Sequence, residues 1–248
     1  MLHSHTYGSG HDVWLALHGW GGSHLTFAPL EPQLPEGVRL IAVDMPGYGR
    51  SAAVRQWSME DYLAPLVELI DSMPEARFAL IGNCSGAIFG LEAALRRPDR
   101  FSRLVLIDPF AWLPWYFRIF LLPFAGRLFY LTAFANPVGR VLANVALSKH
   151  RKEDVSITES FTRVDHDAAL KTLRLLSTVR GASTYRQVAH PVSILRGERT
   201  FAAVTQSIAD WLVNWPQAPV HVVSGAGHLP ILENPALVAQ LAFHEGSS

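Results

Sequence analysis

The chain has 248 residues, enough for one large α/β domain or two small ones. Its 21 Lys and Arg balance its 21 Asp and Glu, so it lacks the basic excess of a nucleic-acid-binding protein. Hydrophobic residues make up 49% of the chain, which is ample for a core, and the single cysteine excludes both an internal disulfide and a cysteine-rich zinc site.

Near-continuous apolar runs predict β-strands separated by helical patterns. Such runs, unlike alternating ones, indicate strands that are covered on both faces. The order of the elements predicts an α/β fold with a mostly parallel, doubly wound sheet. The predicted strands are residues 13–17, 38–43, 77–81, 103–107, 191–195 and 219–223, and the predicted helices are residues 58–71, 85–96, 204–211 and 235–243.

A long insertion interrupts this alternation of strands and helices. Residues 110–188 have a helical pattern and are rich in aromatic side chains, whereas linkers are polar. We therefore expect a helical cap over residues 110–188, on a core built from residues 1–109 and 189–248.

The N-terminal residues lack the charged and apolar regions of a signal peptide. The run that comes nearest to a membrane span, residues 112–135, is interrupted by Arg118 and Arg127 and broken by Pro114 and Pro123. We expect no integral membrane segment and a cytoplasmic location.

The sequence "GNCSG", residues 82–86, follows a predicted strand and opens a predicted helix. A nucleophile presented above a sheet needs a strained strand-to-helix turn, and glycines two residues before and after it relieve the crowding. Counted from these glycines, the central residue is Cys84, while Ser85 lies in the first helical turn. The helix N-terminus also favours a thiolate. We therefore predict Cys84 as the nucleophile.

A second glycine-rich turn, in "LALHGWGGS" (residues 15–23), ends the first predicted strand. Such a turn can direct a backbone N–H at the oxygen of a tetrahedral intermediate. We predict an oxyanion hole formed by the N–H groups of Trp20 and Ser85.

The predicted base is His228. It follows the last predicted strand, on a loop at the edge where the carboxyl ends of parallel strands meet and where α/β sheets bind their ligands.

Five motifs carry a resemblance to a known family: "HGWGG", "VDMPGYGRS", "LIGNCSG", "LVLIDP" and "GAGHLPILENP". With them the chain resembles the α/β-hydrolase superfamily, in the small capped branch that includes BioH-like carboxylesterases and meta-cleavage-product hydrolases. The resemblance implies an α/β-hydrolase fold with a nucleophile at Cys84, an oxyanion hole at Trp20 and Ser85, and a base at His228.

Two residues depart from the family pattern. Cys84 stands where the family usually has serine, and Thr200, in "RGERT", stands where the acid of the triad is expected. Asp108, at the end of a strand from which some superfamily members take their acid, is the preferred replacement. Glu198 is a second candidate, and a Cys–His pair without an acid is a third.

A thiol nucleophile predicts acyl transfer through an acyl-thioester intermediate, with hydrolysis as one outcome. The aromatic cap indicates a hydrophobic acyl group, in a small-molecule ester, thioester or lactone or in a carrier-bound form. The alternative is a hydrolase fold that has lost catalysis and serves as a binding or scaffold protein.

We expect no cofactor and no metal. His3, His5 and His11 form a loose N-terminal set without metal-ligand spacing.

Overall fold

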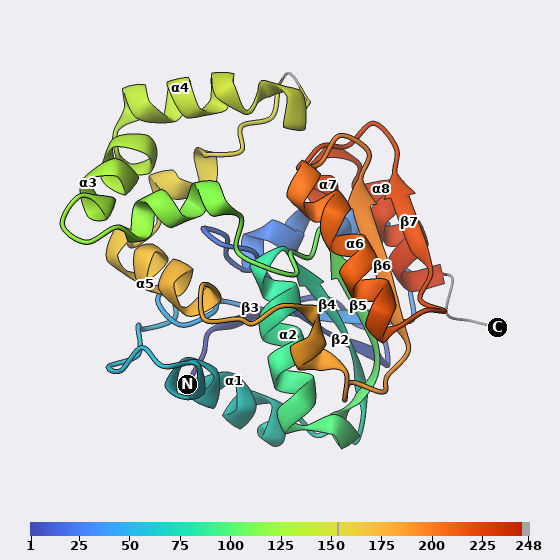
Figure 1. The fold of residues 1–248 in the computed structure, drawn as a ribbon. Helices are drawn as coiled ribbons and strands as arrows, with labels where there is room; N and C mark the ends of the chain where they lie inside the picture. The colour runs from blue at the N-terminus through green and yellow to red at the C-terminus, as the bar shows by residue number, and fades with distance from the viewer. Residues whose placement is uncertain (153, 245–248) are drawn as a thin grey trace.

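The computed structural model describes residues 1–152 and 154–244. Their strands form one seven-stranded sheet in the order β1-β3-β2-β4-β5-β6-β7 (Figure 1). Only the β1–β3 pair is antiparallel, so the predicted α/β fold with a mostly parallel sheet is confirmed. The strands are β1 (Ser4–Gly8), β2 (Asp12–Leu17), β3 (Val38–Val43), β4 (Phe78–Asn83), β5 (Phe101–Ile107), β6 (Val192–Gly197) and β7 (Val220–Val223).

Successive residues of the central strands belong to different cores. In β5, Leu104 and Leu106 pack into one hydrophobic cluster, and Val105 and Ile107 pack into the other. Because side chains alternate across a strand, both faces of the sheet are apolar and both need covering. This is why the strands appear in the sequence as continuous apolar runs.

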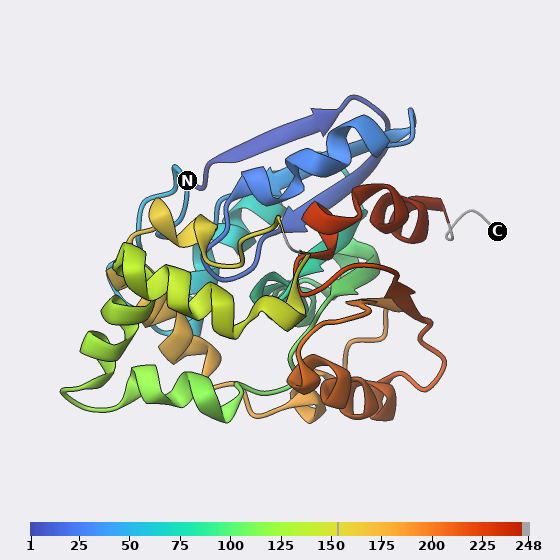
Figure 2. The ribbon, with the colours of Figure 1, turned by 90° about the horizontal axis from the view of Figure 1, so that it is seen from above.

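Helices cover the two faces. The first core includes α1 (Met59–Ser72), α2 (Ser85–Arg96) and α6 (Ala202–Asn214). The second includes the 3-10 helix η1 (His24–Gln33), with α7 (Pro230–Glu233) and α8 (Pro235–Ala239). Figure 2 shows η1 and α8 side by side on this face. The shorter elements η2 (Pro98–Arg100) and η8 (Gln240–His244) complete the core.

The edge strand β1 was not among the six predicted strands. Its sequence, SHTYG, contains one apolar side chain, and only Tyr7 is buried. Pairing with β3, in which Ser4 lies opposite Val43, makes it a strand. Its residues alone carry too weak a pattern to predict that pairing.

The segment between β5 and β6 is helical in the part that the structure describes, and it lies at the upper left of Figure 1, beside the carboxyl ends of the strands. It begins with η3 (Trp115–Leu121), α3 (Gly126–Tyr130), η4 (Leu131–Ala135) and α4 (Pro137–Ala146). It continues with η5 (Ser148–His150), η6 (Glu159–Thr162), α5 (His166–Leu176) and η7 (Ala182–Tyr185).

No single helix among the described residues is long and apolar enough to cross a membrane. One helix pair, Trp115–Leu121 with Gly126–Ala135, meets the length and composition criteria jointly, and it is bent by 116°.

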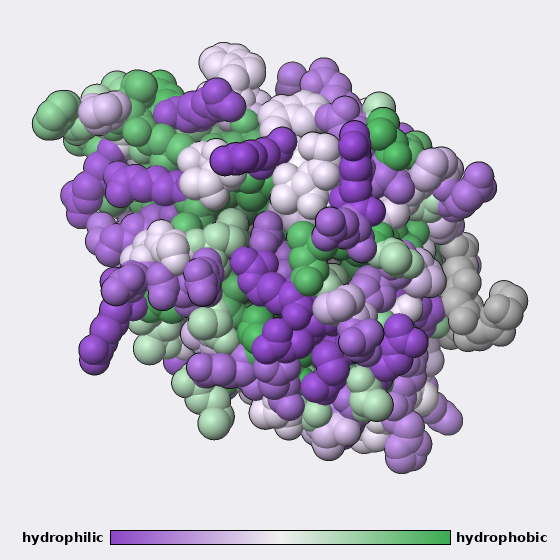
Figure 3. Space-filling view, turned by 60° about the horizontal axis from the view of Figure 1, so that its bottom comes forward, coloured by the Kyte–Doolittle hydropathy of each residue, from purple (hydrophilic) through white to green (hydrophobic). Residues whose placement is uncertain are grey.

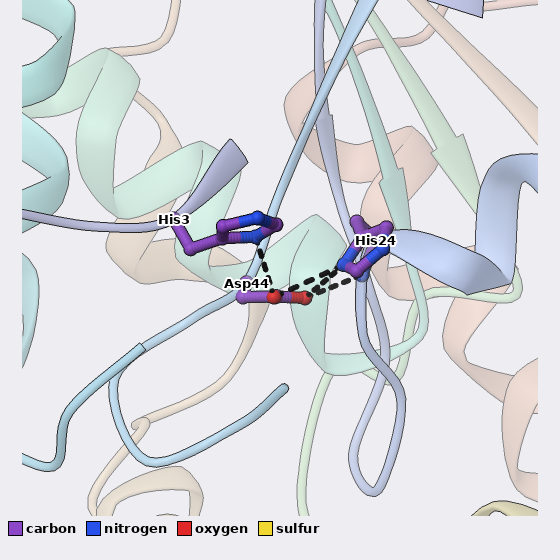
Figure 4. A group of neighbouring side chains, drawn as sticks. All are labelled: His3, His24 and Asp44. Carbon is purple, nitrogen blue, oxygen red and sulfur yellow. Dashed lines mark hydrogen bonds and ion pairs between the residues drawn. The ribbon is translucent and has the colours of Figure 1, made fainter. Parts of the chain in front are cut away.

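A buried carboxylate ties the N-terminus to the loop after β3 (Figure 4). Asp44 accepts hydrogen bonds from the backbone N–H groups of His24 and Arg50, at 2.6 and 2.9 Å. The Nδ1 atoms of His3 and His24 each lie 2.9 Å from its carboxylate oxygens. Burial raises the pKa of Asp44, but the hydrogen bonds from His24 and Arg50 outweigh it, and the net pKa is lowered. One side chain therefore orders three segments of backbone.

Replacing Asp44 by asparagine should destabilise the fold by about 1–3 kcal/mol, because an amide cannot accept all of these bonds. The depressed pKa makes the contribution of Asp44 available above about pH 4, and it is lost as the pH falls through the folded-state pKa. Urea unfolding at neutral pH tests this. Asp71→Asn, which breaks an exposed ion pair with Arg97, is the control. The assignment is wrong if both variants unfold at the same urea concentration.

Candidate active site

Cys84 lies at the tight turn between β4 and α2. Its backbone has φ 51° and ψ −114°, a conformation that non-glycine residues rarely adopt. The turn is fixed on both sides, because the N–H of Cys84 donates to the carbonyl of Ile107 at 2.7 Å and its carbonyl accepts from Ala87 at 3.1 Å. The side chain is half-buried. The strain keeps the sulfur above the edge of the sheet.

The flanking glycines are required by close packing. A Cβ atom on Gly82 would lie 2.5 Å from Cα of Ala87, and one on Gly86 would lie 2.0 Å from the carbonyl oxygen of Leu17. Either contact is far inside van der Waals distance, so larger residues would displace α2 or the loop after β2.

His228 and Asp108 meet at the carboxyl edge of the sheet. Asp108 directly follows β5 and is fully buried, with φ 46°. Its Oδ2 lies 2.8 Å from Nδ1 of His228, and its Oδ1 accepts the N–H of Gly197 at 3.0 Å. This arrangement orients the ring of His228 and leaves Nε2 for Cys84.

Thr200, in the position where the family's acid is expected, also bonds to Asp108. Its hydroxyl donates to Oδ2 of Asp108 at 2.6 Å and lies 3.2 Å from Nδ1 of His228. In the sequence alone, Thr200 is only a departure from the family pattern. Its role as a hydrogen-bonding support for Asp108 depends on the neighbouring ends of β5 and β6, and the local sequence contains no signal for it.

Glu198, the other candidate acid, points elsewhere. Its side chain is exposed, and its Oε2 accepts the backbone N–H of Gly225 at 2.8 Å. The structure thus brings Cys84, His228 and Asp108 together and leaves Glu198 outside.

The environment of His228 favours its protonated form. Burial lowers its pKa, but hydrogen bonds with Asp108 and then Cys84, together with the charges of both groups, raise the pKa of His228 to about 10. In the unfolded chain the pKa is about 6.5. The protonated ring therefore stabilises the fold fully below pH 6.5, and this contribution is lost as the pH rises towards 10.

Two backbone N–H groups of residues that line the cavity beside Cys84 have no acceptor in the part of the chain that the structure describes. Within the residues that the structure describes, neither the N–H of Trp20 nor that of Ser85 donates to another protein group. Both residues line the same cavity as Cys84. The Trp20 side chain is anchored by its Nε1–H, which donates to the carbonyl of Ala169 at 2.8 Å.

His18 stabilises the turn that carries Trp20. Burial, opposed by a hydrogen bond to the backbone of Gly19, lowers the pKa of His18 to about 4, so the ring is neutral at pH 7. Its Nδ1 donates to the carbonyl of Gly19 at 2.8 Å, and its Nε2 accepts the N–H of Met45 at 3.0 Å. Sequence reasoning did not select His18, although it begins the "HGWGG" motif.

A cavity of about 370 Å³ opens beside Cys84, a size suited to a small organic ligand. Cys84, Ser85 and His228 are part of its wall. Most of the remaining wall is apolar and comes from the segment between β5 and β6, including Trp112, Tyr116, Phe117, Phe120, Phe134 and Phe161.

Tyr116 contributes a phenol to this wall. Burial, followed by the charge of Cys84, raises the pKa of Tyr116 to about 12. The phenol is therefore neutral at pH 7.

Among the described residues, the group that could hold a metal ion is His3, His24 and Asp44. The N-terminal set considered from the sequence, His3, His5 and His11, shares only His3 with this group. The carboxylate oxygens of Asp44 already accept the four contacts shown above, so the hydrogen-bonded tie accounts for the cluster without an ion.

Comparisons with known proteins identify the family of this chain. Residues 14–241 match the model of the alpha/beta hydrolase family. The chain therefore belongs to the alpha/beta hydrolase family.

Among curated relatives, the pimeloyl-acyl-carrier-protein methyl ester esterase of Nitrosomonas europaea is 27% identical over 249 residues, which cover 94% of this chain and 95% of that protein. A serine hydrolase-like protein of Danio rerio is 33% identical over 104 residues, but these span only 40% of this chain and 32% of that protein. The solved structure of an enol-lactonase from Burkholderia xenovorans superposes with a TM-score of 0.77, at 19% identity, over 98% of this chain and 95% of that one. These likenesses are consistent with a hydrolase.

Replacing Asp108 by asparagine should lower the pKa of His228 from about 10 by about one unit or more, because the ring loses its charged partner. NMR titration of the histidine rings measures this, with the His228→Gln spectrum for assignment. Glu198→Gln is the matched control and should leave the titration unchanged. If Asp108→Asn titrates like the unsubstituted chain, Asp108 does not set the protonation of His228.

Proposed function

We propose that this protein is a cysteine-nucleophile acyl-transfer enzyme, acting on a hydrophobic acyl ester, thioester or lactone through a Cys84–His228–Asp108 site. The observation that carries the proposal is the placement of Cys84. The thiol lies in a strained turn, hydrogen-bonds with a histidine that is protonated at pH 7, and opens into an apolar cavity.

In the proposed first step, the Cys84 thiolate attacks the acyl carbon. A C–S bond forms, and the electron pair of the carbonyl π bond moves to oxygen, where the N–H groups of Trp20 and Ser85 stabilise it. The tetrahedral intermediate then re-forms the carbonyl and expels the leaving group, which takes the Nε2 proton of His228. The products of this step are an acyl-thioester and a neutral imidazole.

In the second step, the neutral imidazole removes a proton from the acceptor, which is water, an amine or a thiol. The acceptor attacks the thioester, the C–S bond breaks, and the thiolate–imidazolium pair is restored. Asp108 orients the ring and stabilises its positive charge throughout.

We assign residues 110–188 as a cap that binds the acyl group. The support is the aromatic wall that this segment contributes to the cavity. The Nitrosomonas europaea relative is named for an ester on an acyl-carrier protein, so a carrier-bound acyl group is one form of substrate that the proposal includes.

Cys84→Ala should abolish covalent acylation, because Cys84 is the only cysteine in the chain. Ser85→Ala should retain most of it and is the matched control. Incubation with an activated hydrophobic thioester followed by intact-mass measurement reads the adduct directly. Cys84→Ser should acylate at least about tenfold more slowly, because a hydroxyl does not form an ion pair with His228.

If the unsubstituted chain forms no adduct with any activated acyl compound, the proposal fails, and a binding or scaffold protein on a hydrolase fold becomes the better description. If Ser85→Ala loses the adduct and Cys84→Ala keeps it, Ser85 is the nucleophile.

A further inference from the structure

Exposed apolar side chains are concentrated on one part of the surface. Of the fifteen large hydrophobic side chains that are exposed among the described residues, ten lie between positions 115 and 145. Soluble proteins rarely expose contiguous apolar patches of this kind, and such patches mark interaction sites. Figure 3 shows hydrophobic residues gathered at the upper left of the molecule, on the side where α3 lies in Figure 1.

Helix α4 carries the clearest part of this surface. Val138, Val141, Leu142 and Val145, here called the α4 stripe, are each 61–67% exposed. Their spacing of three, four and seven residues places them on one face of the helix. A helix normally turns such a face towards the core, whereas α4 turns it outwards.

The opposite side of α4 lines the cavity. Ala143, Ala146 and the adjacent Leu147 are part of the wall beside Cys84. The helix is therefore a thin layer, with the acyl-binding cavity on one side and the exposed α4 stripe on the other.

A second group of exposed side chains lies on the segment that precedes α4, in η3, in α3 and in the loop between them. Trp115 is 81% exposed, Leu128 is 65% exposed and Phe124 is fully exposed. Trp115 and Leu128 belong to the bent helix pair that is apolar enough for a membrane but too sharply bent to form one straight span, and Phe124 lies at the break between its two helices. Tryptophan and phenylalanine are typical of peripheral contacts with the bilayer interface.

The charge of this segment is one-sided although the chain as a whole is neutral. Residues 110–152 contain no aspartate or glutamate and six basic residues, Arg118, Arg127, Arg140, Lys149, Arg151 and Lys152. Among the described residues, Asp167 lies 3.8 Å from Arg127 in an exposed ion pair, and two acidic residues, Glu153 and Asp154, follow the segment in the sequence. The segment thus combines an excess of positive charge with exposed apolar side chains.

We propose that the outer face of residues 115–145 binds the surface of an anionic lipid bilayer, lying in the interface without crossing it. Basic side chains attract the anionic headgroups, and the α4 stripe with Trp115 and Phe124 enters the boundary between headgroups and acyl chains. A second copy of the chain would supply the apolar contact but would oppose positive charge to positive charge. The bilayer satisfies both features.

This contact with a bilayer adds to the proposed function. Only its consequence for the substrate rests on that proposed function. A hydrophobic acyl compound dissolved in the bilayer would reach Cys84 through the layer formed by α4 and its neighbours. The binding itself requires no chemistry at Cys84, so Cys84→Ala should bind vesicles as the unsubstituted chain does.

Sedimentation with phosphatidylcholine vesicles, with and without phosphatidylglycerol, tests the proposal. The unsubstituted chain should bind the phosphatidylglycerol vesicles, more weakly at high salt. The double variant Val141→Gln, Leu142→Gln should reduce the bound fraction about tenfold. Val213→Gln, at an equally exposed position on α6, is the matched control and should bind normally. Arg118→Gln with Lys149→Gln should remove the preference for phosphatidylglycerol.

Thermal unfolding of each variant confirms that the fold is retained. The proposal is overturned if the unsubstituted chain does not bind phosphatidylglycerol vesicles, or if the double variant at Val141 and Leu142 binds as well as the Val213 control. It is also overturned if the chain forms a dimer that the double variant abolishes, or binds a purified acyl-carrier protein through this face but no vesicle.

Discussion

The carboxylate of Asp108 is the interaction on which the geometry of the site depends. It follows β5 and bonds the backbone N–H of Gly197 at the end of β6, the hydroxyl of Thr200, and the ring of His228 on the loop after β7. The carboxyl ends of three neighbouring parallel strands, β5, β6 and β7, therefore lie around one buried charge. A buried carboxylate is costly unless it is fully hydrogen-bonded, so each of these contacts stabilises the others. The backbone of Asp108 is strained, with φ 46°, and these contacts hold it in that conformation.

The contact between Asp108 and His228 also sets the charge state of the imidazole beside the thiol of Cys84. Burial alone would favour a neutral His228, but Asp108 and Cys84 outweigh it and the ring is protonated. The neutral ring of His18 presents the contrast. It is equally buried but has only backbone partners, and its pKa is therefore lowered to about 4. Two histidines of one fold thus take opposite charge states because their partners differ.

The helical segment above the sheet has two apolar surfaces, and this distinguishes it from a layer that only closes a core. Its inner aromatic side chains line the cavity, while the α4 stripe and Phe124 remain exposed. Trp20 links this segment to the core, because its ring packs against Phe134 and Phe161 and its Nε1–H bonds to α5. Any movement of the helices would therefore reach the turn that carries the backbone N–H of Trp20.

The sequence by itself determined the sheet and the turn at Cys84. Strands that are buried on both faces must be continuous apolar runs, and the turn between β4 and α2 needs Gly82 and Gly86 because of contacts only a few residues away or in the adjacent strand. Only the tertiary structure shows which candidate carboxylate lies beside His228: Asp108 contacts the ring, whereas Glu198 bonds to the backbone of Gly225. Asp108 and His228 are 120 residues apart in the chain, and their contact depends on the order and length of β5, β6 and β7. The pairing of β1, the support from Thr200 and the outward face of α4 likewise arise from contacts, or from the lack of them, between segments distant in sequence, for which a local pattern contains no signal.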